Sequence, residues 1–185
     1  YEIDLSNMSI FFSVLCILIF LNALNMFDGI DSQVSTYSAL FLFYLMIKFN
    51  IPIIVFLFPV IFFCIFYNFQ KKIFLGDSGT NILAGLIAFF LIKFYNSSNN
   101  ITCDQIFLLM MIPGLDMIRL FVVRIFNGKN PFFADNNHIH HLYLRKFSLK
   151  LTFLLIQLQI SLPIIFYNIF NINLLTLILL SSLRS

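Results

Sequence analysis

Three short polar segments interrupt an otherwise apolar sequence, and each holds residues that could bind a cation or a phosphate. In the first, Asn22, Asn25 and Asp28 recur every three residues and are followed by Gly29 and Asp31. On a helix this spacing places the three side chains broadly along one face. Polar groups at the end of an apolar span are costly unless they have partners. Capping and interhelical hydrogen bonds could satisfy Asn22 alone, whereas two carboxylates beside Asn25 favour a site for a cation or a substrate.

The second segment opens a later apolar run with Gly76, Asp77, Ser78 and Gly79, just after Phe74. Asp77 or Ser78 is a good helix N-cap, which is the purely structural interpretation. A helix N-terminus flanked by glycines also offers free N–H groups to a phosphate. Asp77 would then bring a third carboxylate to the site.

The third segment contains His138, His140 and His141, followed by Arg145 and Lys146. Zinc is one interpretation, but structural zinc sites usually include cysteine or a second ligand pair at helical spacing. Binding of a phosphate by the imidazoles and the nearby cations fits better with carboxylates elsewhere that suit magnesium.

A fourth group of charges lies inside one apolar run. Asp116 and Arg119 are spaced as an i,i+3 pair that could be purely structural. Arg124 is either an anchor that extends to the membrane surface or a phosphate contact.

The composition requires a membrane. Of 185 residues, 61% are hydrophobic and 10% are charged, against roughly 25% charged in an ordinary soluble domain. The net charge of +3 is small and scattered, which argues against a nucleic-acid partner. Cys16, Cys64 and Cys103 fit no metal or redox spacing.

The apolar runs are long and apolar on all sides, which favours transmembrane helices over barrel strands. We expect an all-α integral membrane protein, a polytopic bundle of about seven transmembrane helices in a single membrane domain over residues 1–185. The expected spans lie near 7–26, 34–49, 51–69, 79–95, 104–126, 149–168 and 171–183.

The distribution of basic residues predicts which side each connection faces. With the first span starting outside, the inner connections hold Lys71, Lys72, Lys129, Arg145 and Lys146, and the outer ones hold no Lys or Arg. This positive-inside bias places all three polar segments at the cytoplasmic face. Hard oxygen ligands beside histidines and cations suit Mg²⁺ and indicate phosphoryl transfer.

The same residues carry a resemblance to a known family. The three segments, in this order, resemble the polyprenyl-phosphate N-acetylhexosamine-1-phosphate transferases, bacterial inner-membrane enzymes that begin O-antigen and related envelope polysaccharides. The motifs are Asn22-x-x-Asn25-x-x-Asp28-Gly29-x-Asp31, Phe74-x-Gly76-Asp77-x-Gly79 and Pro131-Phe132-x-x-Asp135-x-x-His138-Ile139-His140-His141.

The resemblance implies transfer of N-acetylhexosamine-1-phosphate from a UDP-sugar to undecaprenyl phosphate, with release of UMP. It implies Mg²⁺ as cofactor, with Mn²⁺ as a substitute, the lipid bilayer as surroundings, and it leaves a homodimer open. The roles it implies are catalytic for Asp28, Asp77, His138, His140 and His141, substrate-binding for Gly29, Asp31, Phe74 and Arg124, and metal-binding for Asn25 and Asp77.

The chain departs from the family pattern at three places. It holds no counterpart of the family's Asp-Asp-x-x-Asp motif, Asn136 stands where an arginine is usual, and Ser32 stands where a glycine is usual. We therefore expect an N-terminally truncated member that has no transferase activity alone. The alternatives are a non-catalytic remnant, a membrane subunit, or a transporter of a polyprenyl-phosphate-linked substrate.

Overall fold

The computed structural model describes residues 7–96, 101–130 and 137–170, and every regular element within them is a helix. The elements are α1 (Asn7–Phe27), α2 (Gln33–Phe49), the 3₁₀ turn η1 (Pro52–Leu57), α3 (Phe58–Phe69), α4 (Gly76–Asn96), α5 (Cys103–Phe126), α6 (Ile139–Leu144) and α7 (Leu149–Phe170). The prediction of an all-α membrane protein is confirmed. Six of the seven predicted apolar runs are helical, and the seventh, 171–183, lies outside the described residues.

The predicted number of spans is matched only loosely. Among the described residues, four helical segments are long and apolar enough to cross a bilayer: Pro52–Phe69, Gly76–Asn96, Cys103–Phe126 and Leu149–Ile169. A shorter apolar helix covers Phe11–Phe27, and α2 has 17 residues. About 20 residues are needed to span the hydrocarbon core without thinning or tilt.

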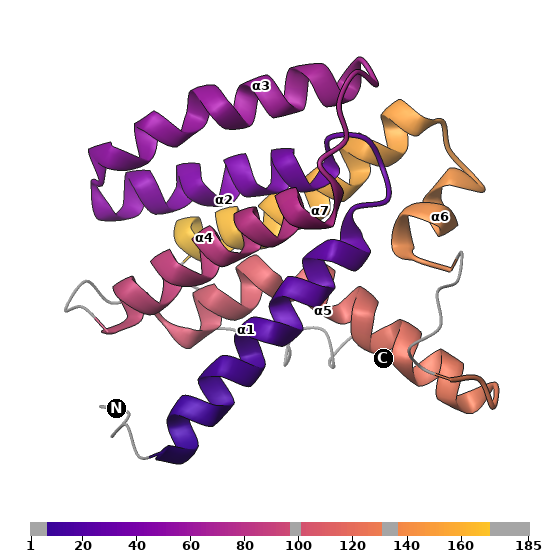
Figure 1. Cartoon of the computed structure of the whole chain (residues 1–185), viewed down its shortest axis with the longest axis horizontal. Helices are drawn as coiled ribbons and strands as arrows, with labels where there is room; N and C mark the ends of the chain where they lie inside the picture. Colours follow the sequence, from indigo (N-terminus) through magenta and orange to yellow (C-terminus); the bar gives the residue numbers. More distant parts are fainter. Residues whose placement is uncertain (1–6, 97–100, 131–136, 171–185) are drawn as a thin grey trace.

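The helix α2 lies in the interior of the bundle and packs against α3, α4 and α7 (Figure 1). Its polar residues Gln33, Ser35 and Ser38 are buried, whereas large apolar residues of the other helices are exposed on the outside of the bundle. The apolar outer surface suits a bilayer, where lipid tails accept it. The Gln157 side-chain amide of α7 donates to the Gln33 carbonyl at 3.2 Å.

The helix α1 crosses the others obliquely and packs mainly against α4 and α5 (Figure 1). Its C-terminal end therefore lies near the start of α4. The short helix α6 packs against the beginning of α7, on the side of the bundle where α1 ends. These three helix ends carry the polar segments that the sequence singled out.

Candidate functional site

A hydrogen bond joins the first polar segment to the second. The Thr80 hydroxyl, fully buried in the first turn of α4, donates to Asn25 Oδ1 of α1 at 2.8 Å. The same hydroxyl oxygen lies 3.1 Å from the Gly76 carbonyl oxygen and 3.0 Å from that of Asp77. Gly76 has a φ of 62°, a left-handed conformation that glycine adopts without strain, and this turn starts α4. The turn brings Asp77 to the end of α1.

Three carboxylates gather where these helix ends meet. Burial, followed by the negative charges of Asp31 and Asp77, raises the pKa of Asp28 to about 6. Asp28 and Asp31 are partly buried, and Asp77 is exposed. Like charges this close disfavour full ionisation, and a cation among them would restore it. The cluster thus has the electrostatics of a cation site, although the roles of its members stay predictions.

The third segment packs directly onto the first. The His140 side chain is buried, and a Cβ atom added at Gly29 would lie 1.9 Å from its Nε2 atom. The rings of His138 and His140 are stacked with centroids 5.4 Å apart, and those of His140 and His141 are 4.2 Å apart. Burial, and then the neighbouring His141 and His138, lower the pKa of His140 to about 4. His140 is therefore neutral at physiological pH.

A contact that sequence spacing did not predict fixes His138. The Asp116 carboxylate of α5 pairs with Arg119 at 2.7 Å and lies 3.3 Å from His138 Nδ1. From its i,i+3 spacing alone, the Asp116–Arg119 pair could be purely structural. A contact with a residue 22 positions later leaves no periodic signal in a sequence.

A second contact of this kind shapes the turn between α1 and α2. Ser32 has a φ of 65°, and its N–H donates to Asn68 Oδ1 at 2.6 Å. The Ser32 hydroxyl also donates to the Ile65 carbonyl at 2.9 Å. These bonds to α3 hold the turn that carries Asp28 and Asp31, and they explain how serine is accommodated where a glycine conformation occurs.

The remaining predicted site residues are less closely joined. Phe74 is exposed in the segment before α4, and Arg124 is buried in the last turn of α5. Asn22 is exposed, and its amide donates to the Leu18 carbonyl of its own helix. The predicted residues Pro131, Phe132, Asp135 and Asn136 lie outside the described residues.

The donor set limits what cation could bind. Among the described residues, no three or more His, Cys, Asp or Glu side chains are arranged to hold a metal ion by themselves. Mg²⁺ usually takes only one or two protein carboxylates and completes its shell with water and substrate phosphates. The oxygens of Asn25, Asp28 and Asp77 are compatible with that mode of binding.

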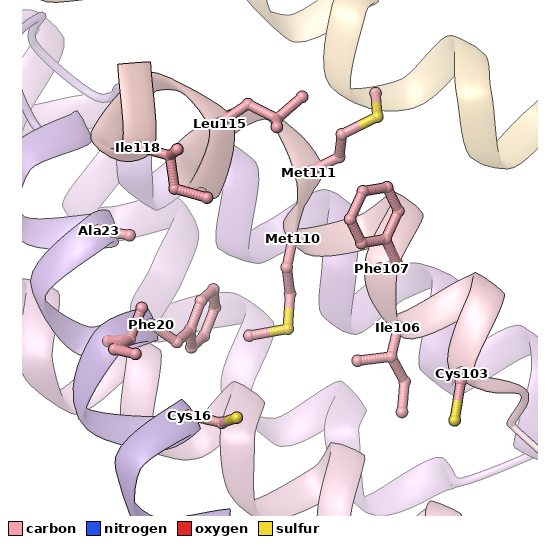
Figure 2. Close-up of a pocket in the computed structure, with 12 residues that line it drawn as sticks. Cys16, Phe20, Ala23, Cys103, Ile106, Phe107, Met110, Met111, Leu115 and Ile118 are labelled. Atoms are coloured by element: carbon pink, nitrogen blue, oxygen red, sulfur yellow. The ribbon is translucent and has the colours of Figure 1, made fainter. Parts of the chain in front are cut away.

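A separate apolar groove lies between α1 and α5 (Figure 2). Its volume is about 380 Å³, and Met110 of α5 extends toward Phe20 of α1, with Cys16 and Cys103 also in its lining. None of the described residues that line the groove is charged. Its surface suits hydrocarbon, and it is distinct from the carboxylate cluster.

Comparisons with known proteins bear on the first two segments. The model of glycosyl transferase family 4 matches residues 2–95, about half of the chain. No solved structure matches.

Three similar curated proteins share one name, undecaprenyl-phosphate alpha-N-acetylglucosaminyl 1-phosphate transferase. The protein of Salmonella typhi is 30% identical over 91 residues, 48% of this chain and 25% of the relative. That of Escherichia coli K12 is 30% identical over 95 residues, 50% of this chain and 26% of the relative. That of Yersinia pestis is 32% identical over 96 residues, 50% of this chain and 26% of the relative. The matched stretch thus spans about a quarter of these relatives.

Proposed function

The chain belongs to glycosyl transferase family 4, and from that premise we propose that it carries part of the active site of a membrane enzyme that transfers a sugar-1-phosphate to undecaprenyl phosphate. The observation that supports this most is the meeting of Asp28, Asp31 and Asp77, where the pKa of Asp28 rises to about 6. The ring of His140 packs on Gly29, which is adjacent to Asp28 in the chain. Carboxylates for a cation and imidazoles for phosphate are the groups that phosphoryl transfer requires.

The proposed donor is a UDP-N-acetylhexosamine, and the proposed acceptor is undecaprenyl phosphate in the bacterial inner membrane. The names of the relatives mention undecaprenyl phosphate and N-acetylglucosaminyl 1-phosphate, which supports both choices. The positive-inside bias supports a cytoplasmic site, where nucleotide sugars occur.

In the proposed reaction, a phosphate oxygen of undecaprenyl phosphate attacks the phosphorus attached to the sugar of the UDP-sugar. The bond from that phosphorus to the bridging oxygen breaks, UMP leaves with the electron pair, and a lipid-linked diphosphate sugar forms. We propose that the Asp28 carboxylate accepts the proton of the attacking phosphate, and its pKa, which lies near that of a phosphate monoester, supports this role. The neutral imidazole of His140 can donate a hydrogen bond to a phosphate oxygen without repelling the nearby cations.

We propose that Mg²⁺, or Mn²⁺ in its place, is held by Asn25 and Asp77 with help from Asp28. When bound, the ion neutralises charge on the two phosphates and on the departing UMP. Asn25 already lies against α4 through Thr80, so one helix pair supplies both ligands.

A transporter fits the structure less well. That alternative needed Asp116 and Arg119 to line a path through the bundle. Both side chains instead contact residues 137–139 next to α6, so they are engaged at one end of the bundle.

The test is Asp77→Asn, which keeps the shape of the side chain and removes its charge. We expect Mn²⁺ binding in the presence of UMP, followed by the electron paramagnetic resonance of free Mn²⁺, to weaken about tenfold or more. In the full-length protein, UMP release from UDP-N-acetylglucosamine should fall in parallel. The matched control is Asp104→Asn, which removes a carboxylate from the first turn of a different helix, α5.

Two results would count against the proposal. Wild-type protein that neither binds Mn²⁺ with UMP nor transfers sugar phosphate would overturn it. Unchanged binding in Asp77→Asn would show that Asp77 only begins a helix.

A further inference from the structure

The carboxylate of Asp116 is a buried anion inside a membrane helix, with a side chain only 4% exposed. An anion in this position is costly unless each oxygen has a partner. Oδ1 accepts from Arg119 Nη2 at 2.7 Å and from the Ile139 N–H at 3.1 Å. Oδ2 lies 3.3 Å from His138 Nδ1. Two of the partners therefore come from outside α5.

Arg119 contacts the residue that precedes the two bound by Asp116. Its Nη2 donates to the Asn137 carbonyl oxygen at 2.5 Å. Asp116 and Arg119, which we call the α5 clamp, thus bind three consecutive residues through a carbonyl, an imidazole and an amide. An ion pair on a helix surface would need none of these contacts. Besides neutralising each other's charge, Asp116 and Arg119 therefore hold residues 137–139 against α5.

The clamp determines which nitrogen of His138 carries a proton. Asp116 is paired with a guanidinium and is therefore an ionised carboxylate, which can only accept hydrogen bonds. His138 Nδ1 must then be the donor, and in a neutral imidazole the other nitrogen, Nε2, is left as an acceptor directed away from Asp116.

We propose that Asp116 is a positioning residue that holds His138 as its Nδ1–H tautomer and fixes the start of α6 against α5. His138 stacks on His140, and His140 packs on Gly29 beside the carboxylates. The clamp therefore sets the position of the whole histidine cluster, His138, His140 and His141, over the carboxylates. The consequence for phosphate binding rests on the function proposed above, whereas the orientation of His138 does not.

The first measurement needs no variant. The chain is labelled with ¹⁵N-histidine, purified in detergent at a pH where the histidines are neutral, and its imidazole nitrogens are assigned by His138→Gln, His140→Gln and His141→Gln. We expect His138 to show a protonated Nδ1 and an unprotonated Nε2. A His138 that carries its proton on Nε2 would overturn the proposal.

The variant Asp116→Asn removes the charge that selects the tautomer. We expect His138 to become a mixture or to shift to Nε2–H, and the His140 signals to move because the stacked ring is released. Asp104→Asn, on the same helix at its other end, should leave all three histidines unchanged. An unaltered His138 in Asp116→Asn would also overturn the proposal.

Loss of the charge leaves Arg119 unpaired and could prevent folding. The double variant Asp116→Asn/Arg119→Gln removes both charges and serves as the second test, with the same expected tautomer change. Mn²⁺ binding with UMP is measured on each protein, and we expect about a tenfold loss in the clamp variants. If wild-type protein binds no Mn²⁺ with UMP, the proposed function fails, and the tautomer of His138 still decides this proposal.

Discussion

The ring of His140 packs against Gly29, which lies more than 100 residues earlier in the chain. The imidazole occupies the space that any side chain at position 29 would need. It is also confined by the neighbouring rings of His138 and His141. The requirement for glycine at position 29 therefore arises from contact with a side chain and not from backbone conformation.

Gly29→Ala should therefore displace the His140 ring and reduce UMP-dependent Mn²⁺ binding by about tenfold. The control is Gly85→Ala in α4, where a Cβ atom meets nothing within 4 Å and helix propensity favours alanine by about 0.5–1 kcal/mol. A double variant Gly29→Ala/His140→Ala should recover thermal stability relative to Gly29→Ala. Additive losses in the double variant would contradict the proposed clash.

Asp28 and His140 give opposite pH dependences of stability. The pKa of Asp28 is raised from 3.8 to about 6 in the folded protein, so the folded state binds more protons and stability falls as pH rises through this window. The pKa of His140 is lowered from 6.5 to about 4, so stability falls as pH drops through 6.5 toward 4. In the wild-type protein the two contributions partly cancel between pH 4 and 6.

Asp28→Asn should separate these contributions. At pH 7 we expect the variant to be more stable than wild type by about 1 kcal/mol, a value reduced for the partial solvent exposure of Asp28. The difference in stability between variant and wild type should vanish near pH 4. Because only the His140 contribution remains in the variant, its stability should rise steadily from pH 4 to 6.5. Thermal unfolding in detergent across this pH range checks both points, and a variant less stable than wild type at pH 7 would contradict them.

The turn between α1 and α2 depends on a side chain from α3. Asn68 is buried, and its Oδ1 accepts the Ser32 N–H at 2.6 Å. Because a buried N–H without a partner costs about 1–3 kcal/mol, the position of the carboxylates is tied to the third helix as well as to the first.

Asn68→Ala should lower the free energy of unfolding by about 1–3 kcal/mol and weaken Mn²⁺ binding with UMP. Ser32→Gly should be close to neutral, because relief of the left-handed strain, about 1–2 kcal/mol, offsets the lost hydrogen bond to Ile65. Denaturation in detergent measures both. A neutral Asn68→Ala would show that another group satisfies Ser32.

Regular elements were the most predictable part of the fold. Long apolar runs predicted α1, α4, α5 and α7 within a few residues. The six-residue helix α6 was not expected, because a run of mixed polarity that is shorter than two turns carries no periodic signal. The start of α4 was expected near residue 79, but the left-handed Gly76 begins the helix earlier.

The candidate site was predictable in its residue types more than in its contacts. Spacing along a helix suggested that Asn25 and Asp28 act together, yet nothing local indicates that Thr80 contacts Asn25. The contacts of Asp116 and Asn68 with distant segments depend on how helices pack. The positive-inside bias placed the histidines at the same membrane face as the carboxylates, but it could not indicate that His140 packs on Gly29.

Across the membrane, the bundle should be oriented with its carboxylate cluster inside. The helix α4, at 21 residues and about 1.5 Å per residue, is long enough for a hydrocarbon core of about 30 Å. Its two ends must then face opposite sides. Lys72 precedes α4 and Asn96 ends it, and both are exposed.

Cysteines introduced at Lys72 and Asn96, in a background without Cys16, Cys64 and Cys103, should label from opposite sides. An impermeant thiol reagent added to intact cells should modify position 96 and reach position 72 only after permeabilisation. The cysteine-free background, carrying neither substitution, gives the unlabelled baseline. Labelling of position 72 from outside would separate the site from cytoplasmic nucleotide sugars and end the transferase proposal.

The hydroxyl of Thr80 has one proton and three oxygen acceptors within reach, on Asn25, Gly76 and Asp77. Rotation about a single bond can therefore exchange one acceptor for another without leaving the proton unpaired. When a cation binds the Asn25 amide oxygen, the Thr80 hydroxyl proton can rotate toward a backbone carbonyl of α4. Freeing Asn25 then requires only this rotation of the Thr80 hydroxyl. Apo and cation-bound forms would then differ by a hydrogen-atom position, and the heavy-atom frame could stay the same in both.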